Sequence, residues 1–168
     1  LVGGPCLEKD SYILCSNIDD SDIQKVVLSA RNLNESLEDK IINWVRENNF
    51  ERIILFGMAF KGQPSTNDLR GSNSVNIARK LHSLGLKLAM FDPVASTEEL
   101  ESLYIGEVIQ NIEIFEFGDS DCLLVLTNHN YFKSSEFTKV IKGKVVFDVW
   151  DVTKISNKIT LGTYGIKK

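Results

Sequence analysis

The sequence predicts an α/β protein built on a parallel sheet, and three observations support this class. Short apolar runs recur through the later part of the chain and alternate with segments of helical period, which is the pattern of strands covered by helices on both faces. A long amphipathic helical stretch precedes them and ends near Phe50. With 168 residues, 43% hydrophobic and 25% charged, the chain has the composition of a soluble globular protein of one or two domains.

The expected elements can be placed in order along the chain. A helix is predicted at 22–47, because apolar residues recur three or four positions apart between Leu33 and Trp44 and the acidic residues at 19–22 suit a helix start. The other expected elements are strand 52–56, helix 74–84, strand 86–91, helix 97–103, a short strand 112–117, strand 122–127, helix 131–141 and strand 144–147. The predicted architecture is a Rossmann-like parallel sheet with flanking helices, preceded by a long connecting helix.

Charge, apolar runs and cysteines exclude several classes of protein. The net charge of −4 gives no basic field, so no nucleic-acid partner is expected. No apolar run approaches the roughly 20 residues that cross a bilayer, since the longest, 53–60, is interrupted by Gly57, and the sequence shows no signal peptide. The charge and the short apolar runs predict no membrane association. The three cysteines form an odd set without metal-ligand spacing, which favours reduced thiols in the cytoplasm and predicts no metal site.

The richest polar segment follows the first expected strand. Its sequence is Gly57-Met58-Ala59-Phe60-Lys61-Gly62, which matches neither a dinucleotide-binding fingerprint nor a P-loop. Because ligands of parallel sheets bind at the carboxyl ends of strands, Lys61 and the nearby Arg70 could contact phosphate oxygens, and a helix starting at Ser72 offers an anion site. The alternative is a local ion pair between Asp68 and Arg70 beside a solvated Lys61.

A second polar segment, Gly3-Gly4-Pro5-Cys6-Leu7-Glu8-Lys9-Asp10, lies at the start of the chain. Two glycines permit a close backbone approach, Lys9 favours a thiolate at Cys6, and Asp10 is a candidate base, so the segment has the composition of a reactive-thiol site. The alternative is an ordinary N-terminal loop that contains a cysteine by chance.

These two segments, with a long helix between them and Asp92-Pro93 after the second expected strand, resemble the UDP-glucose/GDP-mannose dehydrogenase family over essentially the whole chain. The resemblance implies oxidation of the primary alcohol of a nucleotide sugar, such as a UDP-sugar, to a carboxylate, with two NAD⁺ reduced in each turnover. A cysteine thiolate is implied to form a thiohemiacetal with the aldehyde, which is oxidised to a thioester and hydrolysed.

The resemblance also implies roles for the N-terminal residues. Cys6 is implied to be the nucleophile, and Asp10 the carboxylate that assists water and proton movement. Lys9 takes part in the same catalytic group, and Lys9 and Cys6 are implied to lie beside the nicotinamide cofactor. Gly3 is implied to line the sugar pocket.

Further roles follow from the second segment and the long helix. The resemblance implies that Phe60 and Lys61 contact the nucleotide sugar and that Arg70 reaches the NAD. Residues 1–49 are expected to hold the cysteine segment and a central helix that forms a homodimer interface, although the helix could instead pack only on its own domain. Residues 50–168 are expected to form the UDP-binding domain.

Three features depart from the family pattern. The family's dinucleotide-binding domain is expected before Leu1, so the chain alone is expected to be inactive. Glu8 replaces a proline or small polar residue, and Trp150 in Asp148-Val149-Trp150 stands where the family has an arginine, so a phosphate contact is expected to be lost. The alternative to an enzyme is a non-catalytic Rossmann-like module for nucleotide binding or dimerisation.

Five other residues receive a structural interpretation or an open one. Cys122, in an apolar strand, and Cys15 are expected to be structural thiols, and Trp44 a core or interface residue. His82 is expected to be solvated on its helix. His129 follows a strand, so a ligand contact there is an alternative to a structural role.

Overall fold

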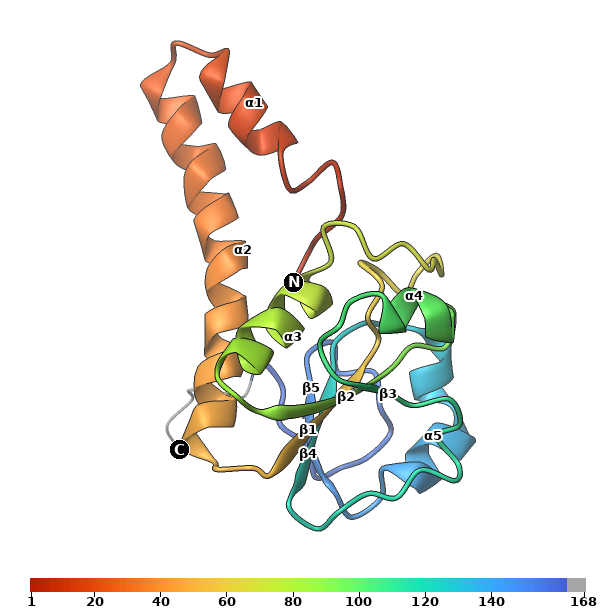
Figure 1. The fold of residues 1–168 in the computed structure, drawn as a ribbon. Coiled ribbons are helices and arrows are strands. Elements are labelled where there is room, and N and C mark those ends of the chain that lie inside the picture. The colour runs from red at the N-terminus through yellow and green to blue at the C-terminus, as the bar shows by residue number, and fades with distance from the viewer. Residues whose placement is uncertain (163–168) are drawn as a thin grey trace.

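The computed structural model describes residues 1–162 as a helical hairpin standing on a parallel sheet that is covered by helices (Figure 1). The elements in chain order are α1 (Asp10–Ser16), α2 (Ser21–Glu47), β1 (Arg52–Phe56), α3 (Asn73–Ser83), β2 (Lys87–Phe91), α4 (Thr97–Glu101), β3 (Glu107–Val108), β4 (Asp121–Val125), the 3₁₀ helix η1 (Asn130–Lys133), α5 (Ser135–Val140) and β5 (Val145–Asp148). The predicted α/β class and the long helix before the sheet are confirmed.

The sheet has five parallel strands in the order β3-β2-β1-β4-β5. The last residue of β1, Phe56, is in register with Phe91 of β2 and Val125 of β4. Because these three strands end level, the loops that follow them lie together at one edge of the sheet. This is the edge at which ligands of open parallel sheets bind.

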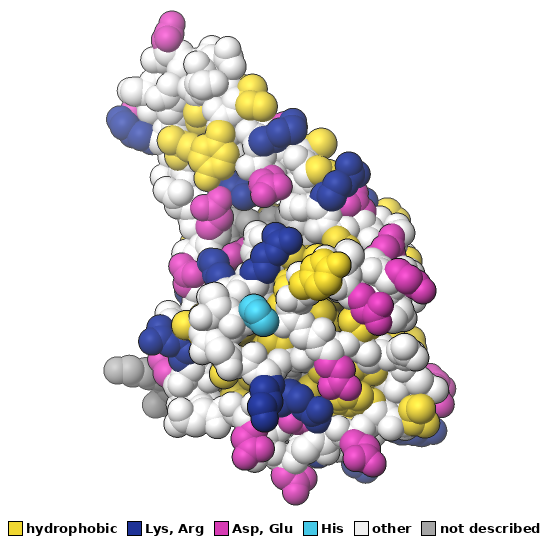
Figure 2. All heavy atoms as spheres, viewed as in Figure 1, with side chains coloured by type: hydrophobic (Ala, Val, Ile, Leu, Met, Phe, Trp, Pro, Cys, Tyr) yellow, Lys and Arg dark blue, Asp and Glu magenta, His cyan; other side chains and the backbone are white. Residues whose placement is uncertain are grey.

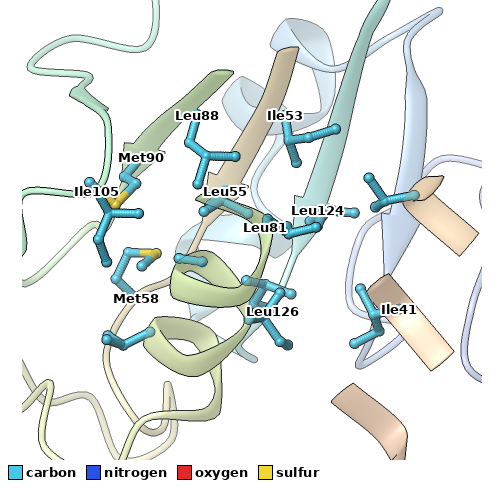
Figure 3. Packing of buried hydrophobic residues seen from close by; sticks show 14 of the residues in the cluster. Ile41, Ile53, Leu55, Met58, Leu81, Leu88, Met90, Ile105, Leu124 and Leu126 are labelled. Carbon is cyan, nitrogen blue, oxygen red and sulfur yellow. The ribbon is translucent and has the colours of Figure 1, made fainter. Parts of the chain in front are cut away.

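Alternate residues of the central strands face opposite layers of the core. Leu55, Leu88 and Leu124 pack with Leu81 of α3 and Ile41 of α2 on one face (Figure 3). Ile54, Phe56, Leu123 and Val125 pack with aromatic residues of η1 and α5 on the other face. Both faces are therefore buried, which explains why the strands are continuously apolar in sequence.

Helix α2 belongs to the core only in its second half. Its start is capped by Asp20, whose carboxylate accepts hydrogen bonds from two amides of the first turn. Its buried residues all lie near its end, where Trp44 packs edge-on against Phe147 with ring centroids 4.9 Å apart, so the core interpretation of Trp44 is confirmed. The first half of α2 projects from the sheet and pairs with α1, which has no buried residue.

Two element predictions were wrong. Residues 112–117 form no strand, and the edge of the sheet is instead the two-residue β3. In the 112–117 segment Phe115 packs beneath the Arg52 guanidinium, at 4.9 Å from its ring centroid, so its apolar spacing serves loop packing. The expected helix 131–141 is divided into η1 and α5, because the Ser134 hydroxyl caps a new helix by accepting the amide of Phe137 at 3.1 Å.

Within residues 1–162, no helix is both long enough and apolar enough to span a membrane.

Candidate functional site

The N-terminal cysteine segment docks directly onto the loop that precedes α3. Gly4 donates its backbone N–H to the carbonyl of Gly71 at 2.8 Å. A Cβ atom on Gly3 would lie 2.6 Å from that same carbonyl oxygen, and one on Gly4, where φ is +117°, would lie 2.9 Å from the Phe60 ring. The two glycines are therefore required for the close approach, and Cys6 is brought to the carboxyl edge of the sheet.

Two polar side chains of α2 fix the same segment from the other side. The Asn34 amide exchanges two hydrogen bonds with the backbone of Val2, each 2.9 Å long. Arg31 donates from Nη1 to the carbonyl of Leu7 at 3.0 Å. The exposed Cys6 is therefore held between two anchored positions. The sequence did not predict the roles of Arg31 and Asn34. In sequence they are only two polar residues that lie one turn apart on the long helix.

Lys9 and Arg70 both interact electrostatically with Cys6. The pKa of Lys9 is raised by its hydrogen bond with Asp10, 2.6 Å long, and by the negative charge of a Cys6 thiolate. The pKa of Arg70 is raised by its hydrogen bonds with Asp68 and again by Cys6. Arg70 in turn lowers the pKa of Asp68 to about 2. The local ion pair between Asp68 and Arg70 is therefore present. Arg70 also interacts electrostatically with Cys6.

The loop after β1 carries Phe60 and Lys61 beside this segment. The ammonium of Lys61 lies 5.1 Å from the centroid of the Phe60 ring, and both side chains are partly exposed. The amide of Phe60 donates to the carbonyl of Asp68 at 3.0 Å. Ser72 donates its hydroxyl to the carbonyl of Met58 at 2.7 Å and caps α3 by accepting two of its amides. The predicted helix start at Ser72 is confirmed. The same hydroxyl joins the start of α3 to the loop after β1.

A groove of about 440 Å³ runs between the cysteine segment and α3. Its lining includes Glu8, Arg70, Arg79 and the first turn of α3. The Arg70 side chain is 78% exposed, so guanidinium N–H groups not used by Asp68 can meet a bound anion. The two arginines and the helix start of this groove suit an anion such as a phosphate group.

The ends of β4 and β5 complete this edge. Trp150 is 39% exposed and donates its indole N–H to the carbonyl of Leu126 at 3.0 Å. The buried Asp148 accepts the Trp150 amide at 3.2 Å and forms an ion pair with Lys158 at 3.2 Å, which fixes the loop. His129 is only 1% exposed, so a direct ligand contact by its side chain is not supported.

The buried thiol Cys122 and the second histidine lie as expected. Cys122 is fully buried in β4, and burial raises the pKa of its thiol, so the structural interpretation is confirmed. Cys15 is half-buried between the hairpin helices, and His82 is exposed on α3. The described part of the chain holds no cluster of three metal-ligating side chains.

Most sequence-predicted site residues are thus brought to one edge of the sheet. Gly3, Cys6 and Lys9 come from the N-terminal segment, and Phe60 and Arg70 come from the loop between β1 and α3. Lys61 lies over the Phe60 ring. Asp10 reaches this group through its ion pair with Lys9. The arrangement places an exposed thiol, cations and the capped start of α3 within one site.

Comparison with known proteins identifies the family. Residues 54–155 match the UDP binding domain of the UDP-glucose/GDP-mannose dehydrogenase family. The chain belongs to this family. The matched domain covers the sheet from its central strand to the loop after β5, and it therefore includes the edge that carries Phe60, Lys61 and Arg70.

Relatives of this dehydrogenase family match almost the whole chain. A UDP-N-acetyl-D-mannosamine dehydrogenase of Methanococcus vannielii is 29% identical over 90% of this chain and 35% of its own length. The UDP-glucose 6-dehydrogenase TuaD of Bacillus subtilis is 28% identical over 87% of this chain and 33% of its own length. The chain thus spans about a third of the length of these relatives.

Solved structures of the same family show the same fold. A UDP-glucose dehydrogenase from Pyrobaculum islandicum aligns with a TM-score of 0.74 and 22% identity over 97% of this chain and 38% of its own. A GDP-mannose dehydrogenase from Pseudomonas aeruginosa aligns with a TM-score of 0.75 and 20% identity over 96% of this chain and 39% of its own. The hairpin and the sheet are both included in these alignments, because they cover nearly all of the chain.

Proposed function

We propose that this chain is the carboxyl-terminal part of an NAD-dependent UDP-sugar 6-dehydrogenase that oxidises the primary alcohol of the sugar to a carboxylate through Cys6. One observation carries the proposal. The hydrogen bond from Gly4 to Gly71 joins the cysteine segment to the UDP binding domain, so that the nucleophile lies beside the loop of Phe60 and Lys61. A cysteine segment unrelated to substrate would have no reason to dock there.

The surroundings of Cys6 support the proposed chemistry. NAD⁺ supplies hydride acceptance for both oxidations. After the first oxidation the Cys6 thiolate adds to the aldehyde carbon, and the oxyanion of the thiohemiacetal forms beside Lys9. Removal of a second hydride gives a thioester, and water then attacks the acyl carbon, releasing the acid and the thiol. Asp10, paired with Lys9 at 2.6 Å, accepts a proton from that water.

The substrate is held by the loop after β1. Lys61 meets the pyrophosphate of the nucleotide sugar, and Phe60 supplies an apolar contact beside it. Gly3 lines the sugar pocket, where a side chain would collide with the carbonyl of Gly71. Arg70, exposed on the side of Cys6, contacts a phosphate of NAD. Trp150 occupies a position where an arginine would add a further charge, so binding here depends more heavily on Lys61.

The helical hairpin is proposed to contact a second copy of the chain. Figure 2 shows hydrophobic side chains on the exposed surface of the hairpin, interspersed with charged ones. The exposed large hydrophobic residues of the hairpin helices are Tyr12, Ile13, Leu14, Ile23, Val26 and Leu33, and Leu7 precedes them in the cysteine segment. Burial of such a surface in a homodimer would remove apolar area from water. The three unpaired cysteines agree with a reducing compartment such as the cytoplasm.

The test uses the longer protein that contains this chain. With UDP-sugars and NAD⁺ it is expected to produce NADH and the sugar acid, whereas residues 1–168 alone are expected to produce neither. Cys6→Ser is expected to abolish acid formation, while Cys15→Ser, a matched change in a half-buried thiol of the hairpin, is expected to retain it. Acid formation by the Cys6→Ser enzyme would remove the nucleophile assignment. A longer protein with no activity on any UDP-sugar would favour the binding-module alternative.

A further inference from the structure

The loop that carries Phe60 and Lys61 is anchored on its first side by a buried carboxylate. Asp92, at the end of β2, accepts the backbone amides of Met58 at 2.6 Å and Ala59 at 3.0 Å on one oxygen, Oδ2. Its other oxygen accepts two amides of its own loop, at 2.9 and 3.0 Å. The side chain of Asp92 has no exposed surface. One carboxylate thus joins the loops that follow β1 and β2.

The second side of the same loop is anchored by the segment after β4. The amide of Gly62 donates to the Asn128 side chain at 3.1 Å. A Cβ on Gly62 would lie 2.3 Å from the backbone nitrogen of His129, so the two backbones are in direct contact. Phe60 and Lys61 are the two residues between these anchors, and their side chains are partly exposed, whereas Asp92 is buried and Asn128 is half-buried.

The two anchors meet behind the loop. The Nε2 atom of His129 lies 3.6 Å from Oδ2 of Asp92, the oxygen that holds the loop amides. Both side chains are buried, and among the described residues Nε2 has no hydrogen-bond partner. Burial opposes ionisation of Asp92, but His129 and the backbone amides outweigh it and lower the pKa of that carboxyl, which keeps it an anion. At 3.6 Å this contact is longer than a hydrogen bond, and the buried setting strengthens the electrostatic attraction of the carboxylate for an N–H placed at Nε2.

We propose that the Asp92–His129 pair positions Phe60 and Lys61 for a nucleoside diphosphate, by closing a ring of contacts through the ends of β1, β2 and β4. This rests on the proposed function for the identity of the ligand. His129 acts here as a positioning residue, since its buried side chain cannot itself reach the ligand. Preorganisation of the loop lowers the ordering cost of binding, so loss of the imidazole contact weakens ligand affinity without removing a ligand contact.

The test replaces the histidine in residues 1–168 and measures both the loop and the ligand. His129→Phe keeps the edge-on packing against Phe132, whose ring centroid is 5.8 Å away, but removes Nε2. His129→Gln keeps an N–H group that can reach Asp92, whereas His129→Asn keeps the amide on a side chain that is too short. His82→Phe, on the exposed last turn of α3, is the matched control.

Hydrogen exchange at single amides reports on the loop, and calorimetry with UDP reports on affinity. In His129→Phe and His129→Asn the amides of Met58, Ala59 and Gly62 are expected to exchange faster, and the UDP dissociation constant is expected to rise about tenfold. In His129→Gln the exchange rates and the UDP dissociation constant are expected to lie close to those of the parent chain. His82→Phe is expected to match the parent chain in both measurements. The Gln–Asn comparison decides the question if His129→Phe does not fold.

Three outcomes would overturn the proposal: parental exchange in the loop amides, a uniform increase of exchange across the sheet, or UDP affinity unchanged by loss of the imidazole. If the parent chain itself does not bind UDP, the proposed function fails for this domain. In that case the loop amides alone decide whether Asp92 and His129 position the loop.

Discussion

Gly4 and Gly71 are joined backbone to backbone, with the Gly4 N–H donating to the Gly71 carbonyl at 2.8 Å. The long α2 helix lies between the two residues in sequence. Two of its side chains, Asn34 and Arg31, form hydrogen bonds with the backbone of the cysteine segment. Cys6 is therefore placed by contacts from two directions. Its position relative to the UDP binding domain is a property of the tertiary fold, because neither segment specifies it alone.

Gly71→Ala is expected to release the cysteine segment. Gly71 has φ of +60°, and a Cβ there would lie 2.7 Å from the carbonyl carbon of Gly4. Gly85→Ala is the control, because Gly85 also has a positive φ, +79°, but open space around its Cβ. Both variants are expected to lower the free energy of unfolding by about 1 kcal/mol through backbone strain. Only Gly71→Ala is expected to lose hydrogen-exchange protection at the Gly4 amide, and protection retained there would contradict the docking.

The three thiols are expected to differ in reactivity. Iodoacetamide added to the native chain is expected to modify Cys6 first, because its side chain is exposed beside two cations. Cys122 is expected to react only after unfolding, since it is buried and burial raises the pKa of its thiol. Peptide mass spectrometry over a time course measures both rates. Modification of Cys122 at the rate of Cys6 in the folded chain would show that β4 is not buried as described.

Asp68 is expected to titrate with a pKa of about 2, which carboxylate NMR can follow. In the unfolded chain the ordinary value is 3.8, so the folded state binds this proton less tightly. The resulting stabilisation is fully present above pH 5 or so and is lost as the pH falls from about 4 to about 2. Its size is small, because the partner Arg70 is largely exposed.

Arg70→Gln is expected to raise the pKa of Asp68 toward 3.8 and to flatten the acid limb of the stability curve. The pKa should remain somewhat below that value, because the backbone amide at position 70 still donates to Asp68 at 3.0 Å. Arg79→Gln, which changes an exposed arginine of the neighbouring helix, is expected to leave Asp68 unchanged. Equal effects of the two variants would argue against a specific pair.

Trp150→Arg is expected to tighten UDP binding about tenfold, or about 1.4 kcal/mol, because it adds a guanidinium at the carboxyl edge of the sheet. Trp150→Gln is the control, since both variants lose the indole hydrogen bond to Leu126 but only one adds charge. Calorimetry at two salt concentrations measures the difference, which should shrink at high salt. Equal affinities of the arginine and glutamine variants would show that this position does not face the phosphates.

The strong periodic patterns made most of the fold predictable. The apolar runs of β1, β2, β4 and β5 have no other explanation in a chain of this composition, and the stripe that ends at Trp44 defines a helix. The two-residue β3 is too short to carry a period. The 112–117 segment has four apolar residues among six, but it forms a loop in which Phe115 packs against Arg52. The local sequence pattern does not distinguish apolar residues of a strand from apolar residues that pack a loop against the sheet.

The candidate site was predictable only where its residues act through their own chemistry. Cys6 and Lys61 stand out by type and by neighbours in sequence. Asn34 hydrogen-bonds to the backbone of Val2, and Asp92 accepts backbone amides of another loop. Because every residue has a backbone, the residue types of their partners give no sign of these contacts in the sequence. The sequence marked Asp92 as part of the Asp92-Pro93 pair that follows the second strand, with no indication that it holds another loop. Its role depends on three strands ending level, which only the folded sheet defines.

UDP titration of isotope-labelled residues 1–168, followed through backbone amide shifts, shows directly whether UDP binds at the loop after β1. The largest changes are expected at Phe60, Lys61 and Gly62, and uridine without phosphates is expected to cause much smaller ones. Lys61→Ala is expected to weaken binding at least tenfold, because the principal cation of the loop is lost. Absence of any shift, or shifts confined to the opposite edge of the sheet, would contradict a UDP site at the carboxyl end of β1.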